Sequence, residues 1–141
     1  MDGIKSRADD AAQENLRAVR VHYATFASGD IERLLEGLDR DVSIQVHDEH
    51  GVKLGEPIVG RDDARSFFEG IMAAVDDSTV EVKDLRADGD RILAHVRLGG
   101  RVKKTGASGS IAAVHLFTVA DGVITGIRTH RPDWRNFEAD S

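Results

Sequence analysis

Apolar residues recur at helical spacing in the first half of the chain and alternate with polar residues in most of the rest. Over residues 9–27 they fall three or four positions apart, which predicts an amphipathic helix. A Gly-Asp pair follows, able to end that helix and cap a second, short one over residues 31–38. The clearest helical stripe comes after Gly60 and consists of Ala64, Phe67, Phe68, Ile71, Met72 and Val75. Three helices are therefore expected.

The alternating segments predict strands. Residues 41–47 alternate strictly, whereas residues 52–59 contain a glycine and a proline and predict a weaker strand. Two more strands are expected over residues 79–87 and 91–98. The glycine-rich, basic residues 101–110 fit either a bulged extension of the next strand or a loop.

Two apolar, β-branched runs over residues 110–131 flank Asp121-Gly122 and predict a hairpin, because a two-residue turn needs positive φ at both positions. Counting outward from that turn puts His115 opposite Arg128 and Ala113 opposite His130. Two imidazoles and a guanidinium would then share an otherwise apolar face. A longer loop with a bulge would reverse this arrangement.

Helices that come early and antiparallel strands that come late indicate an α+β domain, with the helices on one face of a bent sheet. Such a sheet leaves a cavity beneath the helices in which a small molecule can bind. We expect a flexible leader over residues 1–8, a single domain over residues 9–131 and a C-terminal tail over residues 132–141.

Composition narrows the function classes. The net charge of −6 and the scattered basic residues give no footprint for nucleic acid or anionic membranes, so neither is expected as a partner. The absence of cysteine excludes a disulfide framework and a thiolate nucleophile, and fits a cytoplasmic protein. His47-Asp48-Glu49-His50 lies in a predicted turn without the spacing of a helical zinc motif. We therefore expect no metal and no cofactor.

Three stretches carry a family resemblance. They are Tyr23-Ala-Thr-Phe26-Ala-Ser-Gly29-Asp30 with the following Leu34-Leu35 and Asp41-Val42, then Gly60-Arg61-Asp62-Asp63-Ala64, and last the run from Val114 to Ile124. In this order they resemble the nuclear transport factor 2-like superfamily, in its SnoaL-like, ketosteroid-isomerase-related branch. The resemblance implies a cone-shaped barrel, a curved and mostly antiparallel sheet wrapped around three helices, with an apolar pocket. It also implies a homodimer through the outer face of the sheet.

Members of that superfamily isomerise ketosteroids, cyclise polyketides, dehydrate, hydrolyse epoxides or only bind, so the fold does not define the reaction. Its steroid isomerases use a tyrosine, a carboxylate base and a protonated acid. Counting along this chain puts these positions at His22, Val46 and His115, with Tyr23 rotated away. None of the three residue types is retained, so that mechanism is not expected.

The remaining candidates suggest a different acid–base pair. An imidazole is well suited to proton transfer near neutral pH, and a guanidinium can hold an oxyanion. We therefore interpret His115 as a general base and Arg128 as its partner, acting on a small, largely apolar carbonyl-bearing ligand as an isomerase, cyclase or dehydratase. The expected ligand-binding residues are His22, Tyr23, Phe26, Val46, Phe67, Phe117, His130 and Trp134.

Two alternatives to this acid–base enzyme stay open. The domain can be a non-catalytic ligand-binding or dimerisation module in which His115 is only structural. An epoxide-hydrolase relay would need Asp84, Arg97 and Asp133 together in the pocket. In either case the apolar outer face favours a homodimer, which would bury Val114, Leu116, Val123 and Ile127.

Overall fold

The computed structural model describes residues 2–48, 50–130 and 138–139 of the chain. These residues form helices α1 (Asp2–Ser28), α2 (Ile31–Glu36) and α3 (Arg61–Ala74), and strands β1 (Leu38–His47), β2 (Ile58–Val59), β3 (Val75–Asp88), β4 (Arg91–Val102), β5 (Ser108–Ala120), β6 (Val123–His130) and β7 (Glu138–Ala139). Helix α1 thus begins at Asp2 rather than at residue 9, so the expected leader is helical from Asp2 onward.

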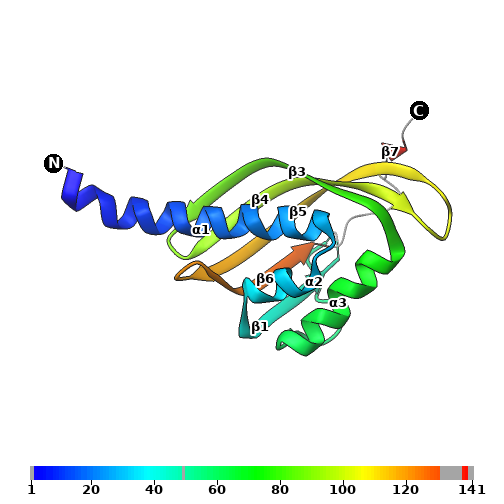
Figure 1. The fold of residues 1–141 in the computed structure, drawn as a ribbon, viewed down its shortest axis with the longest axis horizontal. Coiled ribbons are helices and arrows are strands. Elements are labelled where there is room, and N and C mark those ends of the chain that lie inside the picture. The colour runs from blue at the N-terminus through cyan, green and yellow to red at the C-terminus, as the bar shows by residue number, and fades with distance from the viewer. Residues whose placement is uncertain (1, 49, 131–137, 140–141) are drawn as a thin grey trace.

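The strands form one curved sheet in the order β2-β1-β6-β5-β4-β3, and β7 pairs with β5. Strands β1 and β6 run parallel, and the other neighbours are antiparallel. The edges β2 and β3 do not meet, so the sheet is an open cone. Helix α1 lies along one face of this sheet, with α2 and α3 near β1 (Figure 1). The α+β class expected from the sequence is confirmed.

The core fills the space between the helices and this face, which we call the inner face. Fully buried side chains come from α1, α2 and the alternating positions of β1, β4, β5 and β6; the largest are Phe117, Leu34, Leu38, Ile44, Ile92, Ile124, Val19, Val42, Val96 and Val119. Along β5 the inner positions are odd-numbered, as the alternation predicts. The opposite surface of the sheet is the outer face.

The β5–β6 hairpin departs from the expected register. Its turn is confirmed, because Asp121 and Gly122 have φ of 52° and 76° and Ala120 pairs with Val123. Beyond the turn the register shifts between Thr118 and Val119, and Thr118 pairs with Gly126. Strand β6 therefore has one extra residue, Thr125. A β-bulge of this kind moves every later side chain of its strand to the other face.

This bulge overturns the expected pairing of His115 with Arg128. His115 pairs with Thr129, and Arg128 pairs with Leu116 on the outer face.

Two further segments for which the sequence left the structure open are short or mixed. The weak second strand is reduced to β2 and an isolated bridge between Lys53 and His47. The glycine-rich segment 101–110 is partly strand and partly turn, as β4 ends at Val102 and β5 begins at Ser108.

Candidate functional site

A row of side chains crosses the inner face of the sheet at His115. The strand registers place Val46 of β1, Thr129 of β6, His115 of β5, Ala94 of β4 and Leu85 of β3 side by side. Only His115 in this row can titrate near neutral pH. Val46, the position that counting assigns to a carboxylate base, therefore lies in the same row as His115.

Helix α1 supplies the partner of His115. The phenol oxygen of Tyr23 lies 2.6 Å from Nδ1 of His115, and the two rings stack with centroids 5.8 Å apart at an interplanar angle of 27°. Tyr23 is 5% exposed and His22 is 8% exposed. The expectation that Tyr23 is rotated away is therefore wrong. Consecutive residues on a helix differ by about 100° in direction, and the buried stripe of an amphipathic helix is about 100° wide or more. His22 and Tyr23 can therefore both face the sheet.

Aromatic rings surround the pair. The His22 ring makes edge contacts with Tyr23, Phe68 and Phe117 at centroid distances of 5.7, 5.7 and 5.5 Å. Phe68 also contacts Phe26 and Phe67, at 6.2 and 5.1 Å. Five of the expected ligand-binding residues, His22, Tyr23, Phe26, Phe67 and Phe117, thus meet in one cluster, which we call the inner cluster, together with His115 and Phe68.

Burial controls the charge of the inner cluster. It lowers the pKa of His22 to about 3 and that of His115 to about 4, because an apolar environment disfavours the imidazolium ion. The same cause raises the pKa of Tyr23 above its ordinary value. At neutral pH the cluster therefore holds two neutral imidazoles and a protonated phenol. Such a set donates and accepts hydrogen bonds but carries no charge.

Arg128 and His130 lie on the outer face instead. Arg128 is exposed and pairs with Gln45 of β1 and Leu116 of β5. The ring of His130 stacks on that of His47, with centroids 5.5 Å apart at 23°. Neither residue can reach a ligand on the inner face, because the sheet separates both side chains from that face. Their expected place in the inner pocket is wrong, and the cause is the bulge at Thr125.

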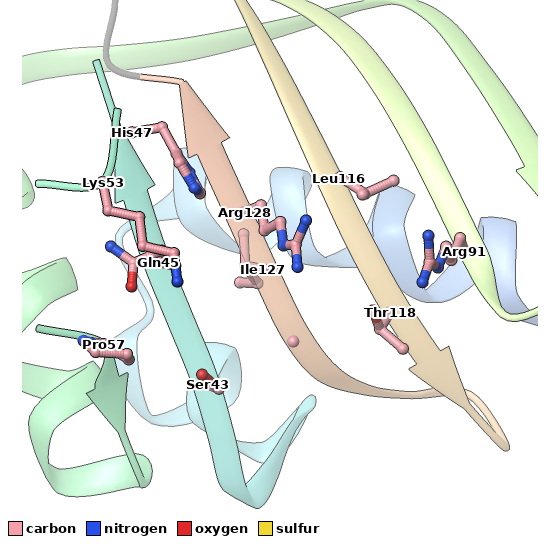
Figure 2. Close-up of a pocket in the computed structure, with 11 residues that line it drawn as sticks. Ser43, Gln45, His47, Lys53, Pro57, Arg91, Leu116, Thr118, Ile127 and Arg128 are labelled. Atoms are coloured by element: carbon pink, nitrogen blue, oxygen red, sulfur yellow. The ribbon is translucent and has the colours of Figure 1, made fainter. Parts of the chain in front are cut away.

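Two cavities accompany the fold. One, of about 300 Å³, opens on the outer face and is shown in Figure 2; its lining is Ser43, Gln45, His47, Lys53, Pro57, Arg91, Leu116, Thr118, Gly126, Ile127 and Arg128. The other, of about 290 Å³, lies between α1, α2 and the hairpin turn and reaches His22. Sequence reasoning missed the outer cavity, although Ser43, Gln45 and His47 alternate on β1 and signalled a polar outer row.

Three other sequence hypotheses have these outcomes. Trp134 and Asp133 lie outside the described residues. Asp84 and Arg97 of the epoxide-hydrolase relay lie away from the inner cluster. Asp84 accepts a hydrogen bond from Arg86, and Arg97 donates one to Ser110. Within the described part of the chain, no group of three His, Cys, Asp or Glu side chains is placed to hold a metal ion. No helix there has the length and hydrophobicity that crossing a membrane requires.

Comparison with known proteins identifies the domain. The family model described as SnoaL-like domain matches residues 19–127, and no curated protein matches the chain. The fold is similar to a candidate SnoaL-like polyketide cyclase from Jannaschia sp. CCS1, with a TM-score of 0.77 and 18% identity over 89% of each chain.

Two enzymes of other kinds have similar folds. SalBIII, an epoxide hydrolase/cyclase-like enzyme in pyran ring formation in the polyether salinomycin, has a TM-score of 0.75 at 20% identity, covering 91% of this chain and 97% of its own. An LEH-like epoxide hydrolase from M. tuberculosis has a TM-score of 0.68 at 18% identity, covering 90% of this chain and 84% of its own. At these identities the likeness shows a shared fold.

Proposed function

Because the chain belongs to the SnoaL-like domain family, we propose that it binds a small, largely apolar carbonyl-bearing ligand beside the inner cluster. The observation that carries the proposal is the 2.6 Å contact between Tyr23 and His115 within an otherwise aromatic and aliphatic surface. A buried polar pair of this kind orients one polar group of a ligand, while the aromatic rings supply apolar contact. The cavity between α1, α2 and the hairpin turn has His22 of the cluster in its wall, but neither Tyr23 nor His115.

The protonation states define the chemistry. Tyr23 stays protonated, so its hydroxyl can donate to Nδ1 of neutral His115, which leaves the ring proton on Nε2. The Nε2–H group can then donate to the carbonyl oxygen of a ligand and stabilise the negative charge of an enolate. This role replaces the partnership with Arg128. It serves an isomerase, cyclase or dehydratase equally well.

A second candidate function is binding without catalysis. It is favoured by Val46, because an apolar side chain occupies the position where a carboxylate base would remove a proton. His115, with its pKa lowered to about 4, is a weak base and compensates poorly for that loss. Under this alternative, the Tyr23–His115 pair selects a carbonyl ligand and does not transform it.

We further propose a homodimer through the outer face. The apolar side chains of Leu93, Val114 and Leu116 are neighbours there and only partly buried within one chain. Ile127 was also expected in this interface, but it is 5% exposed and belongs to the inner core, so the proposed interface does not include it. Sedimentation equilibrium checks this proposal, since a monomer at micromolar concentration would contradict it.

Binding is tested with two probes of nearly equal shape, 2-acetylnaphthalene and 2-ethylnaphthalene, in fluorescence titrations. The wild-type protein should prefer the ketone, and His115→Phe should remove that preference, because a phenyl ring keeps the volume without the donor. Thr118→Val, on the other face of β5, is the control and should change neither affinity. Equal affinity of the wild-type protein for the ketone and the hydrocarbon would refute the proposal.

Catalysis is tested separately by exchange of the methyl protons of 2-acetylnaphthalene in D₂O, followed by NMR. Exchange that the wild-type protein accelerates and His115→Phe does not supports an enolising enzyme. Ketone-selective binding without accelerated exchange supports the binding domain.

A further inference from the structure

The outer cavity gathers positive charge. Three cationic side chains line it, Lys53, Arg91 and Arg128, and no carboxylate does. None of the three forms an ion pair with any described residue. The cross-strand neighbour of Arg91 is Asp88, yet no ion pair joins the two. Figure 2 shows Arg91 and Arg128 extending from either side of β5, with Lys53 on the β1 side.

This arrangement is unusual in an acidic chain with a net charge of −6. Cations near one another in a recess repel, and the repulsion is larger there than on an open surface because less water screens it. Most of the other basic residues with a printed contact lie against a carboxylate, as Arg65 does with Glu32 and Arg101 does with Asp76. The three cations of the outer cavity lack that compensation.

The floor of the cavity is built from small residues. Gly126 of β6 pairs with Ser43 of β1 on one side and with Thr118 of β5 on the other. A Cβ atom at Gly126 would lie 3.7 Å from each neighbour, which is ordinary contact, so larger side chains at this position would project into the cavity. The sheet thus leaves an opening beside the guanidinium groups.

Two polar atoms of the cavity wall lack partners. Gln45 is 8% exposed, and its Nε2 donates to the carbonyl of Val46 at 3.0 Å, whereas its Oε1 is buried without a donor. Nδ1 of His47 is likewise buried and unpartnered among the described residues. Buried polar atoms are normally hydrogen-bonded, and unpaired ones often mark a missing partner such as a ligand or water. Both residues line the cavity with Lys53 and Arg128. Nδ1 of His47 can donate to an anion when it carries the ring proton, whereas Oε1 of Gln45 is an acceptor and needs a donor such as water.

We propose that the outer cavity binds a small oxyanion with at least two negative charges, of the phosphate-monoester or dicarboxylate type. Guanidinium groups bind such oxygens in paired hydrogen bonds, and the ammonium group of Lys53 adds a third positive charge. A volume of about 300 Å³ suits a ligand of this size. The site is separate from the inner cluster, because it lies on the opposite face of the sheet. It adjoins the proposed dimer interface, since Leu116 belongs to both, and the proposal requires the cavity to stay open beside that interface.

The test measures binding of inorganic phosphate and of malonate by isothermal titration calorimetry at constant ionic strength. Arg128→Gln removes one cation, Gly126→Val fills the floor without changing charge, and Arg40→Gln is the control, since Arg40 is an exposed cation of β1 outside the cavity. We expect Arg128→Gln and Gly126→Val each to weaken binding about tenfold or more, and Arg40→Gln to leave it unchanged. Preference for phosphate or for malonate identifies the ligand type.

Three outcomes would overturn the proposal. The first is that neither anion binds the wild-type protein at concentrations up to about 10 mM, because a dissociation constant above that value is too weak for a specific site. The second is equal weakening by Arg40→Gln and Arg128→Gln, which shows general charge attraction only. The third is binding that appears only when Val114→Asp disrupts a dimer, which shows that a second copy of the chain covers the cavity. Circular dichroism of each variant identifies any that do not fold, and Arg91→Gln then replaces them.

Discussion

The two faces of strands β5 and β6 both carry a histidine, but in different environments. On the inner face, His115 is buried, neutral and held by Tyr23. On the outer face, His130 and Arg128 are exposed beside a cavity that holds two more cations. One extra residue, Thr125, separates these outcomes by shifting the register of β6. Residue type therefore predicts little here until the face is known.

Deletion of Thr125 should have the largest effect. Without the bulge, either the turn breaks or Arg128 enters the inner core opposite His115, and an unpaired buried charge costs about 3–5 kcal/mol. We expect the free energy of unfolding in urea to fall by at least about 3 kcal/mol, or the protein not to fold. Thr125→Ser keeps the chain length and is the control. A deletion variant that loses under about 1 kcal/mol would show that the bulge does not set the register.

Adjacent truncations on β5 compare the packing of the two faces. Phe117 is 1% exposed in the core, so Phe117→Ala should cost about 3–5 kcal/mol of unfolding free energy through lost contacts and a cavity. Leu116 is only partly buried on the outer face, and in the monomer Leu116→Ala should cost roughly 1 kcal/mol. Chemical denaturation at low protein concentration measures both. Similar costs would mean that the outer face is also packed in solution.

The buried histidines should make the free energy of unfolding depend on pH. Unfolded imidazoles take up protons near a pKa of about 6.5, whereas burial keeps His22 neutral in the folded state down to about 3 and His115 down to about 4. The unfolded state therefore binds more protons between these values. Stability is fully present above pH 6.5 and falls as the pH drops, by up to about 1.4 kcal/mol per pH unit for each histidine.

Unfolding of two variants from pH 7 to pH 5 isolates that contribution. His115→Phe should remove about 2 kcal/mol of the loss over this range. His95→Ala, at an exposed position of β4 on the outer face, is the control and should keep the wild-type slope. If both variants titrate like the wild-type protein, the His115 ring is not kept neutral by burial.

Tyr23→Phe should have a small effect on stability and a specific effect on His115. It removes one hydroxyl from a buried hydrogen bond, which costs about 1–2 kcal/mol, and leaves Nδ1 of His115 without its donor. A donor to Nδ1 favours the neutral ring, so the pKa of His115 should rise toward its ordinary value in the variant. The ¹⁵N chemical shifts of the His115 ring follow both the pKa and the position of its proton. Unchanged ring shifts would show that the contact does not define the tautomer.

Much of the fold could be predicted from local pattern. The stripe of α3, the alternation of β1 and the Asp121-Gly122 turn each depend on neighbours within a few residues. The weak segment over residues 52–59 was harder, because a glycine and a proline interrupt it and only Ile58–Val59 pairs as a strand with β1. The family follows from several such stretches in a fixed order.

The candidate site divides in the same way. The sequence by itself determined that His115 lies on the apolar inner face of β5, because alternation along a strand is local. Only the tertiary structure decided its partner. The contact of His115 with Tyr23 depends on how α1 packs across the sheet. The position of Arg128 on the outer face depends on the bulge at Thr125, which the residue types in this segment do not predict. Both are set by the fit of distant segments in the whole fold, for which local periodicity carries no information.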